Sequence, residues 1–210
     1  MKRILILSIL FFIEVTSYSQ PKIVSECTVE YSVTASEGDI NWQQSLKNTF
    51  KTVYIKGTKS KVDLISSSPS YSQTTFLDLK KDSVVVLREF GNNKFMTYLN
   101  ENKLREQNSK YEGIQFKELN ESKTILGYDC KKLIAQLKDG SNFTLFYTSS
   151  IIASNKMFEY QFKDVPGFVL EYELVGDNSK GKITYTATKI NFNPIHIQTF
   201  DLPKSGYRIL

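Results

Sequence analysis

The amino-acid sequence predicts an all-β fold, either a single curved antiparallel sheet or a half-open barrel of about ten strands, with little helix. Apolar residues alternate with polar ones in many short runs, as in Val29, Tyr31 and Val33, and this alternation is typical of half-buried strands. Clusters of Gly, Asn and Asp separate the runs at short intervals, which favours hairpins between neighbouring strands. Helical periodicity is nearly absent, so we expect the strands to form the core.

The first half of the chain contains a series of predicted strands separated by turns. Lys56-Gly57-Thr58-Lys59 predicts a hairpin, and Gly91-Asn92-Asn93 predicts another turn. Residues 42–51 allow a short helix, whereas residues 100–112 are polar and are expected to form a loop or a frayed helical turn. The predicted strands are residues 29–34, 53–55, 62–65, 74–79, 84–87 and 95–99.

The second half of the chain continues the pattern. A long strand is predicted over 124–137, with Gly127 marking a bend or bulge within it. Asp139-Gly140 predicts a type I′ hairpin turn before the next strand. In the last strand the alternation shifts near Thr188, which indicates a β-bulge.

A Pro-Gly pair precedes one of these strands. Pro166 fixes φ at about −65° and Gly167 is expected to supply a positive φ, which together predict a type II turn. After the turn Leu170, Tyr172 and Leu174 alternate with more polar residues and therefore share one face of the strand. If the sheet encloses a groove, these three side chains are the candidates to line it.

Residues 1–19 have the features of a secretory signal peptide, and residues 20–210 are predicted to form one β-rich domain. Lys2 and Arg3 precede an apolar segment, residues 4–13, that is too short to span a membrane. An uncleaved anchor is the weaker alternative, because no second apolar run follows. We therefore expect an exported protein, periplasmic or secreted, with no transmembrane segment in the mature chain.

The composition argues against nucleic acids, metals and cofactors. Lys and Arg number 27 against 22 Asp and Glu, and the resulting net charge of +5 is spread along the chain rather than gathered in a basic patch. One histidine and two distant cysteines do not have the spacing of a metal site. No nucleophile motif accompanies His196, which is expected to point outward, so no catalytic residue and no enzyme activity are predicted.

The two cysteines, Cys27 and Cys130, allow two interpretations. In an exported chain they can form one disulfide, which would close a loop across most of the domain. Alternatively they are buried free thiols, because cysteine packs well as a small apolar residue. The sequence leaves both open.

Three segments of the second half read I-L-G-Y-D-C-K-K at 125–132, F-Y-T-S-S-I at 146–151 and V-P-G-F-V-L-E at 165–171. In order and spacing, they resemble the GLPGLI family of secreted Bacteroidetes proteins. The chain departs from the family pattern at Phe146, where tryptophan is common, at Asp164-Val165, where Gly-Leu is common, and at Phe168, where leucine is common. The residues that carry the resemblance most specifically are Gly127, Tyr128, Cys130, Pro166 and Gly167.

The family has no established activity, and the resemblance implies a secreted or periplasmic β-rich domain. More distantly, it implies a half-barrel similar to lipoprotein carriers and able to hold an apolar ligand. The 12 Tyr and 14 Phe residues either fill the core or line such a groove. We expect a non-enzymatic binding module of the bacterial envelope, for an apolar ligand, a lipid or a protein partner. The alternative is a structural or interaction accessory of an outer-membrane or surface assembly without a pocket, and a hydrolase is the least favoured.

Overall fold

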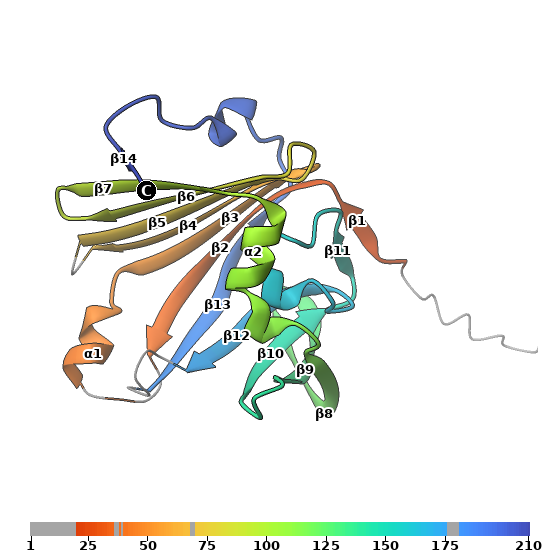
Figure 1. Ribbon diagram of the computed structural model, residues 1–210. Coiled ribbons are helices and arrows are strands. Elements are labelled where there is room, and N and C mark those ends of the chain that lie inside the picture. Colours follow the sequence, from red (N-terminus) through yellow and green to blue (C-terminus); the bar gives the residue numbers. More distant parts are fainter. Residues whose placement is uncertain (1–19, 36–37, 39, 68–69, 176–180) are drawn as a thin grey trace, which may run out of the picture.

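A curved, open sheet of 12 strands dominates the structure (Figure 1), as the sequence predicted. The computed structural model describes residues 20–35, 38, 40–67, 70–175 and 181–210, so the predicted signal peptide lies outside the described residues. The strand order is β14-β7-β6-β5-β4-β3-β2-β13-β12-β10-β9-β8, and all neighbours are antiparallel except β14 and β7. The strands of this sheet are β2 (Glu26–Ala35), β3 (Thr49–Lys56), β4 (Lys59–Ser67), β5 (Ser70–Asp78), β6 (Ser83–Phe90), β7 (Asn93–Leu99), β8 (Gln115–Ile125), β9 (Tyr128–Gln136), β10 (Asn142–Thr148), β12 (Phe168–Val175), β13 (Lys182–Asn191) and β14 (Arg208–Ile209).

Two meanders form the sheet and meet where β13 pairs with β2. In the first, β2 to β7 follow one another as antiparallel neighbours, and the predicted hairpin at Gly57 is confirmed because Lys56 pairs with Lys59. In the second, β8, β9, β10, β12 and β13 pair in this order, each antiparallel to the next. A separate parallel pair, β1 (Lys22–Val24) and β11 (Ile151–Ala153), lies beside the sheet.

The chain reverses at Leu126-Gly127, so the prediction of one long strand over 124–137 is wrong. Leu126 has a φ of 52° and Gly127 a φ of 80°, and positive φ at both central residues is the geometry of a type I′ hairpin. Ile125 and Tyr128 pair across this turn. The prediction failed because an apolar leucine occupies a turn position where Asn or Asp is usual.

Gly167 is required for space and not for backbone conformation. Its φ is outside the positive region, so the predicted type II turn is wrong. A Cβ atom at this position would lie 2.1 Å from the carbonyl oxygen of Thr148 and 2.8 Å from Cδ2 of Tyr147. The chain therefore approaches the end of β10 more closely than any residue with a side chain permits.

The predicted β-bulge near Thr188 is confirmed. The register between β13 and β2 shifts between Ala187 and Lys189, which adds one residue to β13. Tyr185 and Ile190 therefore pack against the same core cluster although an odd number of positions separates them.

A second bulge lies in β12 and was not predicted. Val169 and Glu171 pair with consecutive residues of β10, which leaves Leu170 as an extra residue. Leu170 consequently packs in the core cluster that contains Cys27, whereas Val169 and Tyr172 belong to the neighbouring cluster. Leu170 and Tyr172 therefore do not share one face of β12, contrary to what the alternation of the sequence predicted.

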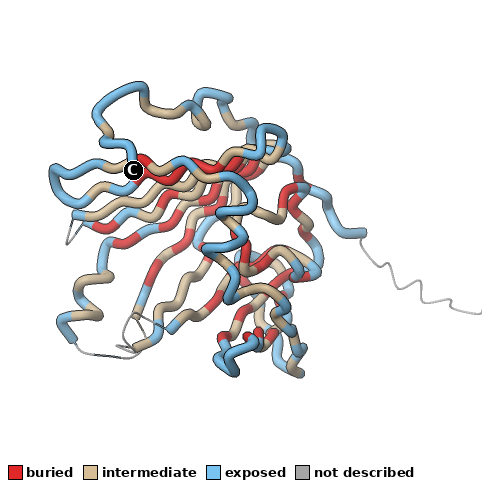
Figure 2. Tube along the Cα trace, in the orientation of Figure 1, coloured by how far each residue is buried: buried red, intermediate tan, exposed pale blue. Residues whose placement is uncertain are grey.

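Different segments cover the two faces of the sheet (Figures 1 and 2). On the concave side lie α2 (Glu101–Gln107), η1 (Ser109–Tyr111) and residues 154–167, here called the strap, which includes η2 (Tyr160–Phe162). On the convex side the C-terminal segment, with η4 (Ile197–Phe200), packs through Leu202 and Tyr207 on Val85, Leu87 and Met96. The first meander carries one more helix, α1 (Ile40–Ser45). No helix within the described ranges is long and apolar enough to span a membrane.

Candidate ligand-binding cavity

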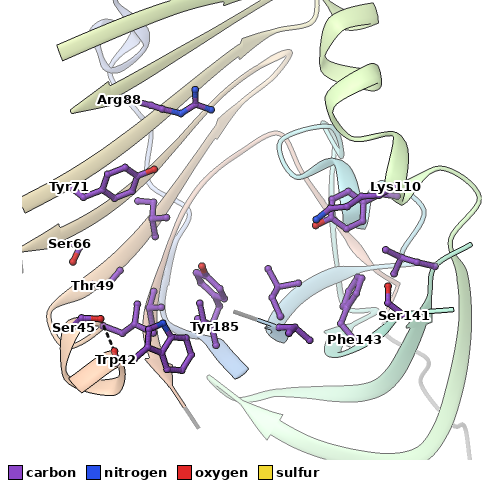
Figure 3. Close-up of a pocket in the computed structure, with 18 of the residues that line it drawn as sticks. Trp42, Ser45, Thr49, Ser66, Tyr71, Arg88, Lys110, Ser141, Phe143 and Tyr185 are labelled. Atoms are coloured by element: carbon purple, nitrogen blue, oxygen red, sulfur yellow. Dashed lines mark hydrogen bonds between the residues drawn. The ribbon is translucent and has the colours of Figure 1, made fainter. Parts of the chain in front are cut away.

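The strap fills one part of the concave face and leaves a cavity of about 750 Å³ in another. One wall is formed by strands β3 to β6, and the opposite wall by β10, β12, β13 and η1, with α1 at one end (Figure 3). This volume falls within the range of about 300–1,000 Å³ that is typical of small-molecule sites. The residues that line the cavity are Val33, Trp42, Ser45, Leu46, Thr49, Leu64, Ser66, Tyr71, Arg88, Phe90, Lys110, Tyr111, Leu137, Ser141, Asn142, Phe143, Leu174, Val175, Ile183 and Tyr185.

The two walls of the cavity differ in polarity. Cross-strand pairing places Thr49 beside Ser66, Ser66 beside Tyr71 and Tyr71 beside Phe90, in one row across β3 to β6. Arg88 lies in the next row, so this wall is largely polar. On the opposite wall the strand residues are mostly aliphatic or aromatic: Phe143, Leu174, Val175, Ile183 and Tyr185. The cavity therefore has a polar side and an apolar side.

Two hydroxyl groups on the polar wall have no hydrogen-bond partner among the described residues. They are Oγ1 of Thr49 and Oγ of Ser66, whose residues are only 5% and 9% exposed. A buried hydroxyl without a partner costs about 1–3 kcal/mol. Because both residues line the cavity, a polar group of a ligand placed there would satisfy them.

Arg88 is the cation of the polar wall. Its Nε donates to Oε1 of Gln73 at 3.0 Å, and Gln73 also accepts from the hydroxyl of Tyr71 at 3.2 Å. No ion pair joins Arg88 to any described carboxylate. The remaining guanidinium N–H groups are thus available to an anion at the cavity.

Lys110 is a second cation, on the other side of the cavity (Figure 3). Its ammonium lies 4.8 Å from the centre of the Tyr111 ring. The charge of Lys110 acts on the carboxylate of Asp139. The pKa of Asp139 is lowered mainly by hydrogen bonds from Ser141 and in small part by Lys110. Asp139 does not line the cavity, and no described Asp or Glu does.

Where the strap covers the concave face, the polar groups are paired. Lys51 is buried, and its ammonium donates to Glu159 of the strap and to the hydroxyl of Tyr172 at 2.7 Å. The same ammonium lies 5.0 Å from the ring centre of Tyr31 and 5.5 Å from that of Tyr185. Burial lowers the pKa of Lys51, and the Glu159 carboxylate opposes that shift. This cluster fixes the strap to β3, and Lys51 does not line the cavity.

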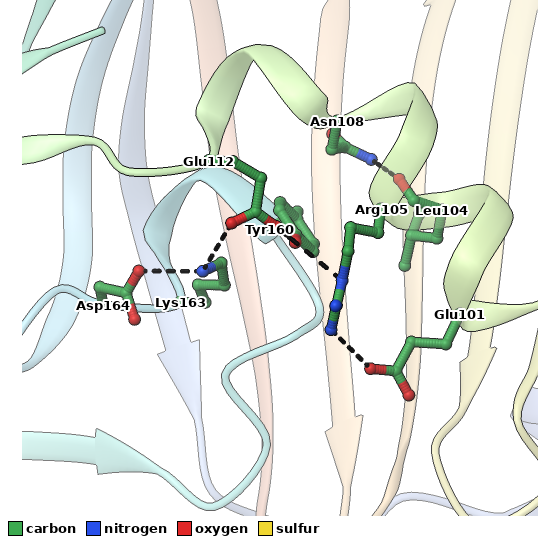
Figure 4. Close-up of polar contacts among 8 residues, drawn as sticks. All are labelled: Glu101, Leu104, Arg105, Asn108, Glu112, Tyr160, Lys163 and Asp164. Atoms are coloured by element: carbon green, nitrogen blue, oxygen red, sulfur yellow. Dashed lines mark hydrogen bonds and ion pairs between the residues drawn. The ribbon is translucent and has the colours of Figure 1, made fainter. Parts of the chain in front are cut away.

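The strap is also tied to η1 at the side of the cavity (Figure 4). Glu112 accepts a hydrogen bond from Tyr160 and pairs with Lys163 at 3.8 Å and with Arg105 at 3.9 Å. The hydrogen bond from Tyr160 lowers the pKa of Glu112. These contacts hold the segment that carries Lys110 against the strap.

A smaller cavity of about 250 Å³ lies on the far side of Arg88. It is lined by sheet residues such as Gln73 and Val86, by Leu104 of α2 and by Glu159 of the strap. Arg88 lines both cavities. The arginine therefore stands where the two spaces adjoin.

The residues predicted to line a groove take three different places. Leu174 lines the cavity. Tyr172 is buried beside it in the Lys51 cluster, with its ring stacked on Tyr185 at 4.6 Å. Leu170 is fully buried in the core because of the bulge in β12.

The remaining predicted residues have structural roles. Cys27 and Cys130 are free thiols buried in one core cluster. Burial raises the pKa of Cys27 to about 12 and that of Cys130 to about 11. Tyr128 and Pro166 lie outside the cavity, and His196 is exposed where η4 begins. Within the part of the chain that the structure describes, no group of three or more His, Cys, Asp or Glu could hold a metal ion.

Sequence reasoning missed the residues that distinguish the cavity. Thr49, Ser66 and Arg88 come from three separate strands and meet only through cross-strand pairing. One signal was present: Arg88 interrupts the apolar run that begins at Val84. Trp42, the single tryptophan, stands in the polar segment predicted as a short helix.

Comparisons with known proteins show the fold and nothing finer. No family model and no curated protein matches the chain. The chain is similar to an uncharacterised conserved protein from Thermus thermophilus, with 8% identity and a TM-score of 0.51 over 89% of this chain and 90% of that one. It is also similar to PNGF-II, with 17% identity and a TM-score of 0.48 over 88% of this chain. This chain spans 30% of the PNGF-II chain, and neither likeness carries a functional argument.

Proposed function

We propose that the protein is an exported, non-enzymatic binding module of the bacterial envelope that holds an apolar ligand in the 750 Å³ cavity. The observation that carries this proposal is the cavity itself, because six aromatic rings from different elements line one space. They are Trp42, Tyr71, Phe90, Tyr111, Phe143 and Tyr185. Aromatic and aliphatic linings with a few polar groups are typical of small-molecule sites.

The non-enzymatic part of the proposal is supported by the protonation state of the two cysteine thiols and by the position of the single histidine. The raised pKa values of Cys27 and Cys130 keep both thiols protonated at neutral pH. His196 is exposed and lies outside the cavity. Export and kinship with the GLPGLI family remain proposals that rest on residues 1–19 and on the three sequence segments.

A purely structural or interaction role is the second candidate. Phe50 and Ile65 form a cross-strand pair on the face opposite Thr49 and Lys51, and they are 57% and 49% exposed. An exposed apolar pair of this kind suits a protein partner. It is small, however, and the cavity is the more specific feature.

The test is the binding of the uncharged fluorescent probe N-phenyl-1-naphthylamine. The native protein is expected to bind one probe molecule saturably, and Leu174→Trp, which fills the apolar wall of the cavity, is expected to abolish the binding. Ile209→Trp adds the same ring at a position that is 67% exposed on β14 and serves as the matched control. Binding that is absent in the native protein, or unchanged in Leu174→Trp while its circular dichroism is native, would overturn the proposal.

A further inference from the structure

We infer that the ligand is an anionic amphiphile, with a carboxylate or phosphate head at Arg88 and an apolar chain on the wall formed by β10, β12 and β13, in a cavity whose positive charge is increased by Lys110 on the opposite side. This inference rests on the proposed function, because it specifies the ligand of the same cavity.

The sign of the head group follows from the charges at the cavity. Two cations, Arg88 and Lys110, line it from opposite sides, and no described carboxylate does. An arginine without an ion-pair partner offers paired N–H donors that match the oxygens of a carboxylate or phosphate. A cationic ligand would meet two like charges here, and a neutral one would leave both cations unused.

The orientation follows from the polarity of the two walls. The polar wall carries Arg88 together with the two unpartnered hydroxyls of Thr49 and Ser66. The opposite wall offers Leu174, Ile183 and Phe143 to an alkyl chain. An amphiphile that lies across the cavity places its polar head on the polar side and buries its chain on the apolar side, where removal of methylene groups from water is favourable.

The size of the space is compatible with such a molecule. The cavity of about 750 Å³ adjoins the smaller cavity of about 250 Å³ at Arg88. A head group at Arg88 therefore lies at the junction, and the larger space is left for the chain.

The experiment is a calorimetric titration of the full mature chain with decanoate, decyl phosphate, decanol and decyltrimethylammonium below their micellar concentrations. Emission of Trp42, the single tryptophan and a cavity residue, reports occupancy independently. We expect the two anions to bind about tenfold or more tighter than decanol, since charge-assisted hydrogen bonds exceed neutral ones, and the cation to bind weakest. The ratio of decanoate to decyl phosphate distinguishes the two head groups.

Matched variants locate the head group. Arg88→Gln is expected to lower affinity for the anions about tenfold, and Lys110→Gln, on the opposite side of the cavity, to lower it less. Both variants are expected to leave decanol unchanged. Lys94→Gln and Lys103→Gln remove the same charge from residues that do not line the cavity and are expected to have no effect.

The outcomes separate the two proposals. If none of the four compounds binds, the inference is wrong, and the proposed function fails with it only if the naphthylamine probe does not bind either. If decanol binds as tightly as the anions, or if Lys103→Gln weakens binding of the anions as much as Arg88→Gln does, the inference is wrong and the proposed function stands.

Discussion

The concave face has a filled part and an open part, and their polar groups differ. Under the strap, the ammonium of Lys51 has a carboxylate and a hydroxyl as partners and is surrounded by tyrosine rings. In the cavity, the hydroxyls of Thr49 and Ser66, which belong to the neighbouring row of the same sheet, have no partner among the described residues. Since buried polar groups in proteins are nearly always hydrogen-bonded, the filled part has the features of internal structure, and the unpartnered hydroxyls of the open part support the proposed ligand site.

The largest effect is expected from breaking the buried pair of the filled part. Glu159→Gln leaves the Lys51 ammonium buried without a counter-charge, which should lower the free energy of unfolding by about 3–5 kcal/mol. Urea unfolding followed by circular dichroism measures the change. The double variant Lys51→Met/Glu159→Leu removes both charges and is expected to recover most of the loss. A Glu159→Gln protein as stable as the native one would show that the pair does not hold the strap.

The second prediction compares the loss of stability when a leucine is truncated to alanine in the filled part and in the open part of the concave face. Leu145 is fully buried in the core beside Tyr172, so Leu145→Ala should cost about 2–5 kcal/mol. Leu174 already faces open space, so Leu174→Ala should cost less than about 1 kcal/mol and instead weaken binding of the probe. Equal losses of stability at the two positions would contradict the division of the concave face.

The two buried thiols, Cys27 and Cys130, make the stability of the filled core depend on pH. Their pKa values in the folded protein, about 12 for Cys27 and about 11 for Cys130, lie above the value of about 8.5 for an unfolded thiol. Their contribution to stability is therefore complete below about pH 8.5 and is lost as the pH rises toward 11 and 12. We expect neither thiol to react with Ellman's reagent at pH 8 until the protein unfolds.

Unfolding without reductant also decides between the two cysteine interpretations. Release of two reactive thiols is expected from the free, buried residues of the structure. Release of none would show that a disulfide joins Cys27 and Cys130 in the native protein. Rapid reaction in the folded state would contradict their burial.

The smallest effect is expected at the unpartnered hydroxyls. Thr49→Val and Ser66→Ala remove buried groups that have no partner among the described residues, so the ligand-free protein should keep its stability or gain up to about 1 kcal/mol. The same variants should weaken binding of decyl phosphate, which calorimetry measures. A clear loss of stability in the ligand-free protein would show that these hydroxyls serve the fold and not a ligand.

Local patterns in the sequence predicted the sheet well, because consecutive strands pair and their alternation is preserved. The hairpin at Gly57 and the bulge near Thr188 were both readable. The turn at Leu126 and the bulge at Leu170 were not, since neither carries the usual residue types. The buried position of Lys51 had a weak signal, because it shares the strand face of Val53 and Ile55.

The cavity itself could not be predicted from local patterns. It exists because the strap, which is distant in sequence, covers β3 at Lys51 and stops short of Thr49 and Ser66. Arg88 lines it from β6 and Lys110 from η1, on opposite sides of the cavity, and no local sequence pattern relates the two. Only Leu174 of the three predicted groove residues lines it.

The most direct test of the central claim is native mass spectrometry of the protein purified from its own host. The account predicts one bound anionic amphiphile per native chain and none on Leu174→Trp prepared in the same way. A bare polypeptide mass for both proteins, from preparations in which the native chain also fails to bind the naphthylamine probe, would contradict it.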